Sequence, residues 1–253
     1  MKDINVLSFS GGRTSAYMLA KYKDEIDYVI FCNTGKEAEG TLDFVRKCGE
    51  YFDKEIIWLE YNCESPNKFD IVNFNTASRN GEPFEKLIKK NNYLPSQTGR
   101  KCTTELKVLT VKRYLKSLNI DLEYINMYLG IRKDEPRRYY KIKGNNKDKW
   151  ENKMPLFKDN TTLNDVLKYW SEQPFDLDIH SHLGNCDLCF NKRISKKQLI
   201  LKENPEVAKW WIEMEDYTGK KFNITYSIKD ILNLSISQLN VFDNDIECFC
   251  NID

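Results

Sequence analysis

The chain has 253 residues, of which 41% are hydrophobic, so it is long enough to bury the core of one large α/β domain. Its 39 basic and 38 acidic residues nearly balance, which excludes a strong overall field for nucleic acid or membrane and leaves such contacts to local patches. No apolar run approaches the roughly 18 to 20 residues of a membrane span, and the first residues lack a signal peptide's apolar region. We therefore expect a cytoplasmic protein with no membrane partner.

The N-terminal residues predict a strand, a glycine turn and a helix. The apolar run 4–9 leads into a loop at residues 10–15, and a helical pattern covers residues 13–22. This order suits an anion, because glycines let the backbone approach closely and the first helical N–H groups have no intrahelical partner. An ordinary strand-to-helix turn is the alternative. The residues that we expect at a phosphate are Ser10, Gly11, Gly12, Arg13, Thr14 and Ser15.

Strands and helices then alternate along the chain. Residues 27–32 and 55–59 are short apolar runs typical of buried strands, and a helical pattern covers residues 39–52 between them. The alternation predicts an α/β fold with a parallel sheet and with ligands bound at the carboxyl ends of the strands. The turn after the second strand lies at such an end, so we expect Asn33, Thr34 and Gly35 near the ligand, with a plain turn as the alternative.

The pattern weakens over residues 61–100, which resembles an insertion with an extra strand at 69–74 and a short helix at 83–90. Thr103 is a candidate N-cap for a helix that runs to residue 118. Cys102 would then lie at a helix N-terminus next to Arg100, and both features lower the pKa of a thiol. A buried packing cysteine is the alternative.

A charged loop follows the next predicted strand, at residues 124–130. Its arginines and acids suit contacts with phosphate and Mg²⁺, and a charged surface loop is the alternative. The candidate residues are Arg132, Asp134, Glu135, Arg137 and Arg138.

The second half contains further helices and a cysteine pair. Helical patterns cover residues 162–172, with Val166, Leu167 and Trp170 directed inward, and residues 195–204 and 205–217. The spacing of Cys186 and Cys189 fits two ligands of a metal or a redox dithiol. A basic patch beside the pair would suit an anionic substrate, or form a solvated helix face; it contains Lys192, Arg193, Lys196 and Lys197.

Four segments together resemble the phosphoadenosine phosphosulfate (PAPS) reductase family in its broad sense, within the PP-loop superfamily of adenine nucleotide α-hydrolases. They are residues 10–15, 33–35, 99–107 and 129–138, and the resemblance covers about residues 4 to 200. It implies a Rossmann-like (HUP-type) parallel sheet sandwiched by helices, with a helical C-terminal part that carries the cysteine pair. The expected parts are residues 1–180 and 181–253. Because many members are phage-encoded, the location implied for such a member is the host cytoplasm.

The resemblance also implies ligands. ATP or a related adenine nucleotide, with Mg²⁺, would be held by the 10–15 loop and by residues near it, including Arg100, Gly130, Ile131 and Arg132. Cys102, Cys186 and Cys189 would bind a [4Fe–4S] cluster, with zinc as the alternative metal. Cys250 or Cys248 in the tail would supply the fourth ligand. Thr14 departs from the family pattern, which has aspartate there.

Three functions follow from this comparison. The leading one is an ATP-dependent transferase that adenylates an acceptor, releases pyrophosphate and prepares a nucleic acid or nucleotide for sulfur transfer or another modification. The second is a sulfonucleotide reductase, in which Cys248 would be the nucleophile; Glu247-Cys248 matches only the beginning of the reductase tail. The third is a nucleotide-binding protein without catalysis. A homodimer is left open.

Overall fold

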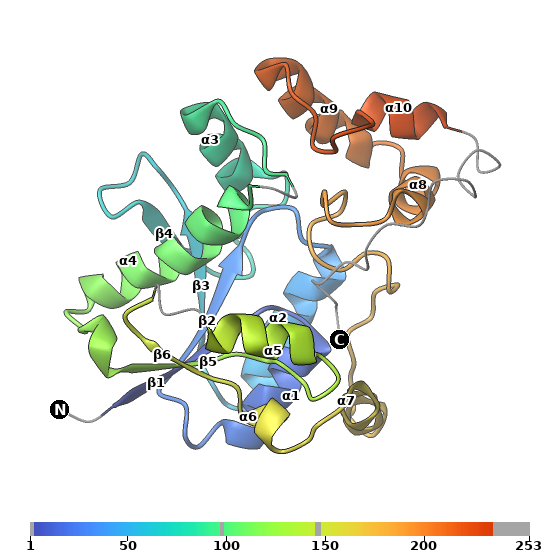
Figure 1. The fold of residues 1–253 in the computed structure, drawn as a ribbon. Helices are drawn as coiled ribbons and strands as arrows, with labels where there is room; N and C mark the ends of the chain where they lie inside the picture. The colour runs from blue at the N-terminus through green and yellow to red at the C-terminus, as the bar shows by residue number, and fades with distance from the viewer. Residues whose placement is uncertain (1–2, 97–98, 145–147, 235–253) are drawn as a thin grey trace.

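The computed structural model describes residues 3–96, 99–144 and 148–234. Within them, six strands form one sheet in the order β4-β3-β2-β1-β5-β6 (Figure 1). All neighbouring pairs are parallel except β3 and β4, which are antiparallel. The strands are β1 (Ile4–Phe9), β2 (Tyr28–Asn33), β3 (Ile56–Tyr61), β4 (Phe69–Val72), β5 (Ile125–Tyr128) and β6 (Glu151–Lys153). The predicted Rossmann-like α/β fold is confirmed.

The strand order places a change of direction beside β1. The chain moves outward from β1 to β2 and β3, and it then returns to place β5 on the other side of β1. Val6 pairs with Tyr28 on one side and with Met127 on the other. The carboxyl ends of β1 and β5 are therefore neighbours at a topological switch point, where open α/β sheets bind ligands.

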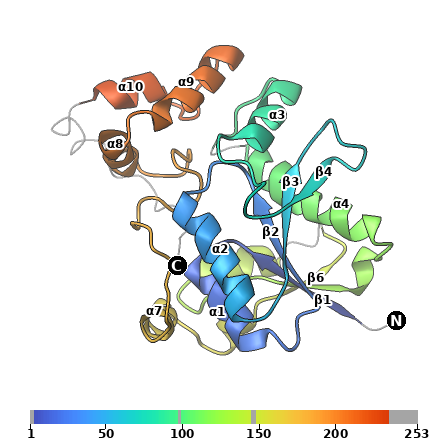
Figure 2. The ribbon, with the colours of Figure 1, turned by 180° about the vertical axis from the view of Figure 1, so that it is seen from behind.

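Helices cover both faces of the sheet because its strands alternate between two hydrophobic clusters. Leu7 and Phe31 face a cluster shared with α1, α2 and α7, whereas Val6 and Ile30 face one shared with α4. Figure 1 shows the α4 side, and Figure 2 shows α1 and α2 from the opposite side. The helices up to α7 are α1 (Arg13–Tyr22), α2 (Glu39–Tyr51), α3 (Glu82–Asn91), α4 (Thr110–Ser117), α5 (Pro136–Lys143), α6 (Pro155–Lys158) and α7 (Leu163–Ser171), and a short 3₁₀ helix, η2 (Leu122–Tyr124), precedes β5.

The segment that precedes α4 is a π-helix, η1 (Cys102–Leu109), which continues directly into α4. Its N-cap is Lys101 and not Thr103, so the predicted cap was wrong by two residues. π-Helical segments are rare and often occur at functional sites, which fits the position of η1 beside the carboxyl ends of the strands. The helix α5 was not predicted, because its arginines and the acids before it are also typical of a charged loop.

The C-terminal helices are α8 (Ile194–Glu203), α9 (Val207–Thr218) and α10 (Ile228–Asn233), which lie together beside α3 (Figure 1). They share a hydrophobic cluster with residues of α3 and η1, so this core spans both predicted parts of the chain. No helix in the described ranges combines the length and apolarity needed to cross a bilayer.

Two predictions about side chains in this half were wrong. Leu167 is 42% exposed, although Val166 and Trp170 are buried as predicted. The proposed basic patch loses two members, because Lys192 and Lys197 are buried. The ammonium group of Lys192 donates to the carbonyl oxygens of His182 and Asp187, so it supports the chain around the cysteine pair.

Candidate functional site

The 10–15 loop joins β1 to α1 in a backbone conformation that requires glycine. Gly11 has φ of +79°, and a Cβ there would lie 2.7 Å from Thr41 Cγ2. Gly12 is the N-cap of α1, and no described side chain caps this end of the helix. The first N–H groups of α1 therefore face the same edge as the loop, which is the geometry that binds phosphate.

Hydrogen bonds of two serine hydroxyl groups stabilise the loop internally. Ser15 Oγ donates to the carbonyl of Gly12 at 2.9 Å and accepts from the backbone N–H of Ser10 at 3.1 Å. The two serine hydroxyls lie 3.0 Å apart. Ser10 is exposed while Ser15 is buried, so Ser10 is the hydroxyl at the open side and Ser15 braces the turn.

The loop after β5 lies directly against the 10–15 loop. A Cβ on Gly130 would lie 3.4 Å from the backbone nitrogen of Ser15, so glycine allows this close approach. Arg132, which is 4% exposed, donates from Nη1 to Thr14 Oγ1 at 3.0 Å. Two segments separated by more than 100 residues thus form one site, as their order in the sheet predicts.

Asp134 and Glu135 hold Arg132 in place. Arg132 Nε donates to Asp134 Oδ1 at 3.0 Å, and its backbone N–H donates to Glu135 Oε2 at 3.1 Å. The remaining carboxylate oxygens accept from Leu163 N–H and from Arg138. All four acid oxygens therefore already accept a hydrogen bond, and in this arrangement the two acids position the arginine; their role toward Mg²⁺ stays a prediction.

The side chains of other predicted nucleotide contacts have partners elsewhere or are exposed. The guanidinium of Arg13 forms a bidentate pair with Asp176, at 2.7 and 2.9 Å, and so is directed to the chain after α7. Ile131 is buried in a small cluster with Met154 and Phe157. Arg137 is exposed on α5, and Arg100 is exposed just before η1.

The turn after β2 lies beside the loop but uses its predicted residues differently. The side chain of Asn33 is fully buried and donates to Glu60 Oε1 at 2.6 Å and to the carbonyl of Ser78 at 2.8 Å. It therefore holds the turn together, and Gly35, with φ of +77°, packs against Gly81. Thr34 contacts the cysteine pair instead, because its hydroxyl lies 3.4 Å from Cys186 Sγ.

Glu37 is a site residue that the sequence interpretation missed. Its Oε2 accepts from the N–H and hydroxyl of Thr34 at 2.9 and 2.8 Å, while its buried Oε1 has no hydrogen-bond partner in the described part of the chain. Lys107 Nζ lies 3.9 Å from that oxygen. Glu37 follows the predicted 33–35 turn by two residues, so its proximity to the turn was the available signal.

A cavity of about 200 Å³ opens behind Ser10 on the α4 face of the sheet. Its walls are mostly apolar and come from β1, β2, β5, β6, η1, α4, α5 and the segment before β6; Lys107 and Asp148 are its charged lining residues. Burial raises the pKa of the Cys32 thiol in its wall to about 12, so this cysteine packs as a neutral group. The cavity is suited to an apolar planar group whose charged end reaches the loop.

The three cysteines predicted as metal ligands come from distant segments but pack on the same hydrophobic cluster. Cys102 begins η1, and Cys189 N–H donates to the carbonyl of Cys186 at 3.2 Å. No group of three or more His, Cys, Asp or Glu side chains in the described ranges has an arrangement that could hold a metal ion. Cys248 and Cys250 lie outside the described residues.

The predicted activation of Cys102 was wrong in direction. Burial raises the pKa of its thiol above the ordinary value, and this effect outweighs the opposing effects of Lys107, Thr103 and Arg100. Burial likewise raises the pKa of Cys186, with the Glu37 carboxylate adding to it. The sequence indicates the helix N-terminus and the nearby cations, which lower the pKa of Cys102. It does not indicate the hydrophobic core that buries the thiol and raises this pKa.

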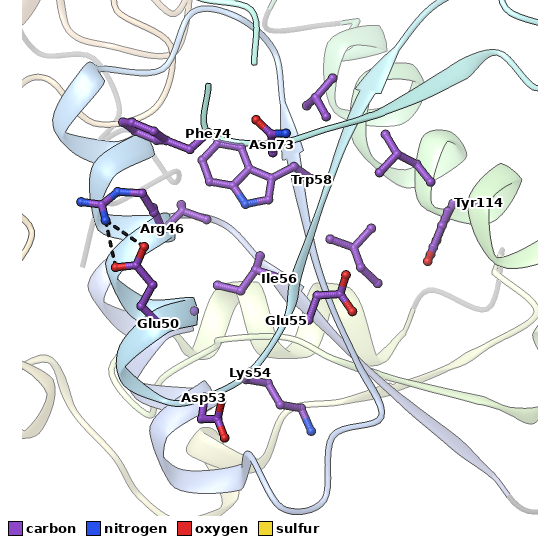
Figure 3. Close-up of a pocket in the computed structure, with 15 residues that line it drawn as sticks. Arg46, Glu50, Asp53, Lys54, Glu55, Ile56, Trp58, Asn73, Phe74 and Tyr114 are labelled. Carbon is purple, nitrogen blue, oxygen red and sulfur yellow. Dashed lines mark hydrogen bonds and ion pairs between the residues drawn. The ribbon is translucent and has the colours of Figure 1, made fainter. Parts of the chain in front are cut away.

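A second hollow, of about 560 Å³, lies apart from this site (Figure 3). It is formed by the second half of α2, the beginning of β3 and the end of β4, with Trp58 and Phe74 in its wall. Arg46 at its rim pairs with Glu50 at 2.8 Å. Because it borders the amino-terminal half of β3, it is away from the switch point.

Comparison with known proteins identifies a family whose matching domain contains the 10–15 loop and the loop of Arg132. A family model described as the phosphoadenosine phosphosulfate reductase domain matches residues 4–177. An uncharacterized nin region protein, ORF290, of Escherichia phage lambda is 32% identical over 213 residues, which are 79% of this chain and 70% of that protein. An uncharacterized protein of Methanocaldococcus jannaschii, MJ0973, is 30% identical over 112 residues, 43% of this chain and 22% of that protein.

Proposed function

Because the chain belongs to the phosphoadenosine phosphosulfate reductase domain family of the PP-loop superfamily, we propose that it binds ATP and adenylates an acceptor with release of pyrophosphate. The observation that carries this proposal is the contact between the 10–15 loop and the loop of Arg132 at adjoining strand ends. This pairing would offer the backbone N–H groups of the loop and a fixed guanidinium to the same anion. Phosphoryl transfer requires such groups to stabilise the charge on the phosphate.

In the proposed complex the nucleoside fills the cavity behind Ser10, and the phosphates extend over the N-terminus of α1. The cavity and the loop meet at Ser10, which supports this direction. Arg132 faces the α-phosphate and Lys107 approaches from η1. Mg²⁺, when bound, would neutralise phosphate charge.

The reaction is an in-line displacement at the α-phosphorus. An acceptor oxygen forms the new bond to phosphorus, the bond to the bridging oxygen breaks, and pyrophosphate leaves with the electron pair. The acceptor's proton passes to Glu37 Oε1, because this buried oxygen accepts no hydrogen bond within the described residues. The loop N–H groups and Arg132 stabilise the charge that develops on the phosphate oxygens.

The acceptor oxygen, once adenylated, is a leaving group that a sulfur or nitrogen nucleophile can replace. A [4Fe–4S] cluster would supply sulfur chemistry, but the described residues form no ligand set for it. Sulfonucleotide reduction is the second candidate, favoured by the description of the matching family model. It predicts thiol-dependent release of sulfite that Cys248→Ser abolishes.

The test measures AMP and pyrophosphate from ATP with single-stranded RNA, DNA and nucleotides as acceptors. We expect Arg132→Met to lower the rate by roughly 100-fold or more, as for loss of one charge-stabilising donor. Glu37→Gln should lower the rate while ATP still binds. Arg79→Met is the control, because Arg79 pairs with Glu39 on the surface. Failure of the wild-type protein to bind ATP with any divalent metal would overturn the proposal.

A further inference from the structure

The helix α5 has the largest share of basic residues among the described helices of this nearly neutral chain. Its eight residues contain four basic side chains and no acidic one, and it begins four residues after Arg132. Elsewhere, exposed cations are commonly paired along their own helix, as Lys47 is with Asp43 at 2.7 Å and Lys89 with Glu85 at 2.5 Å. The strongest local excess of positive charge at the candidate site is thus on α5.

One face of α5 is occupied by the protein itself. Tyr139 stacks on Phe157 with ring centroids 3.7 Å apart, and Ile142 lies in the wall of the cavity behind Ser10. Arg138 pairs with Glu135. These contacts fix the rotation of the helix about its axis and leave the opposite face to solvent.

The opposite face carries cations beside an aromatic ring. Arg137, Tyr140 and Lys141 are spaced three and four residues apart, so they share one face, and all are exposed. Tyr140 is 67% exposed, which is unusual for a large aromatic side chain. Its ring makes T-shaped contacts with Tyr139 and Phe157, at centroid distances of 5.3 and 6.4 Å, which hold it at the border of the packed face. Lys143 and Lys133 are also exposed and extend the positive charge to both sides.

We infer that the outer face of α5 binds a single-stranded nucleic acid and delivers it as the acceptor. Arg137, Lys141 and Lys143 contact successive phosphates, while the ring of Tyr140 stacks on an unpaired base. An aromatic ring amid cations favours an unpaired strand over a duplex, whose bases are covered, and over an acidic protein, which needs no stacking partner. The inference rests on the proposed function and names its acceptor. One face of α5 lines the cavity proposed for the nucleoside, and the opposite face would hold the strand that is adenylated.

The test is fluorescence anisotropy with a labelled 20-nucleotide RNA, the DNA of the same sequence, and the corresponding duplex. We expect the single strands to bind more tightly than the duplex, with an affinity that falls steeply as salt rises. The RNA and DNA arms decide which strand is preferred. Lys141→Glu with Lys143→Glu should weaken strand binding at least tenfold and flatten the salt dependence, and Tyr140→Ala should weaken it about tenfold with little change in that dependence.

Two control variants carry the same changes elsewhere. Lys202→Glu with Lys209→Glu reverses exposed charges on α8 and α9, and Tyr217→Ala removes a tyrosine that is 55% exposed on α9. An equal loss in these controls, absence of strand binding by the wild-type protein, or equal binding of poly-glutamate would overturn the inference. ATP binding is measured separately on the wild-type protein and on each variant. Failure of the wild-type protein to bind ATP would overturn the proposed function and not the strand-binding inference.

Discussion

Arg132 Nη1 donates to Thr14 Oγ1 at 3.0 Å, across the adjoining ends of β1 and β5. Thr14 stands where the resembling pattern has an aspartate, so a neutral hydroxyl here accepts the bond that a carboxylate could accept. The guanidinium is held from three sides, by Thr14, Asp134 and Glu135. Replacement of the motif aspartate therefore leaves the arginine ordered and less neutralised, which favours a bound anion.

Thr14→Val should weaken this arrangement, whereas Thr14→Ser should preserve it. The valine variant removes the acceptor of a buried guanidinium N–H, and we expect the free energy of unfolding to fall by about 1–3 kcal/mol. Calorimetric titration with ATP should show a corresponding loss of affinity because Arg132 is no longer fixed. Equal behaviour of the two variants in denaturant unfolding and titration would show that the hydroxyl has no such role.

The position of the nucleoside can be tested by filling the cavity behind Ser10. Val108→Trp places a large ring in its wall, so we expect ATP binding to be lost while the fold is kept. Val72→Trp is a matched control because Val72, which is also partly buried, lines the separate hollow of Figure 3. Equilibrium dialysis with labelled ATP provides the measurement. Binding by Val108→Trp, or its loss in Val72→Trp alone, would contradict the assignment.

The thiol in the same cavity gives a prediction about pH. Burial raises the pKa of Cys32 to about 12, so from pH 7 to pH 10 the thiolate fraction should rise about tenfold per unit without a plateau. Alkylation of Cys32 by iodoacetamide, followed by mass spectrometry, should show the same slope and should slow when ATP is present. Cys48 is the control: it is buried in the opposite core, so ATP should not protect it. A plateau near pH 9 would contradict the effect of burial.

The sequence predicted the glycine turn at residues 10–15 and the helix that follows it well because their signals are local. Residues 4–9 alternate toward two cores, Gly11 requires a positive φ, and α1 has the predicted bounds Arg13–Tyr22. The family resemblance placed Gly130 near this loop, and in the structure both lie at the carboxyl ends of adjacent parallel strands.

Side-chain directions could not be predicted in the same way, because their partners are distant in the sequence. Arg13 is directed away from the phosphate position by Asp176, and Asn33 is directed inward by Glu60. The thiol of Cys102 is governed by a core that includes residues of α8 to α10. Local rules describe such a residue's neighbours along the chain, but the competing contacts form only when the chain folds.

The cysteine sites are tested by metal analysis of protein purified without oxygen. If the cluster forms, we expect iron and sulfide near four per chain, and Cys102→Ser, Cys186→Ser and Cys189→Ser should each lower both. Cys48→Ser is the control, because Cys48 packs in the core beneath α2. Cys248→Ser and Cys250→Ser, singly and together, test the predicted fourth ligand.

The three cysteines come from two segments that meet on one hydrophobic cluster, so a bound metal should also tie η1 to the chain before α8. We therefore expect chelation to lower the midpoint of thermal unfolding, and Cys186→Ser to remove that sensitivity. Zinc in place of iron would assign a structural site and remove the basis for sulfur transfer, leaving adenylation alone. An unchanged metal content in all three variants would show that these thiols are packing residues, consistent with their raised pKa values at Cys102 and Cys186.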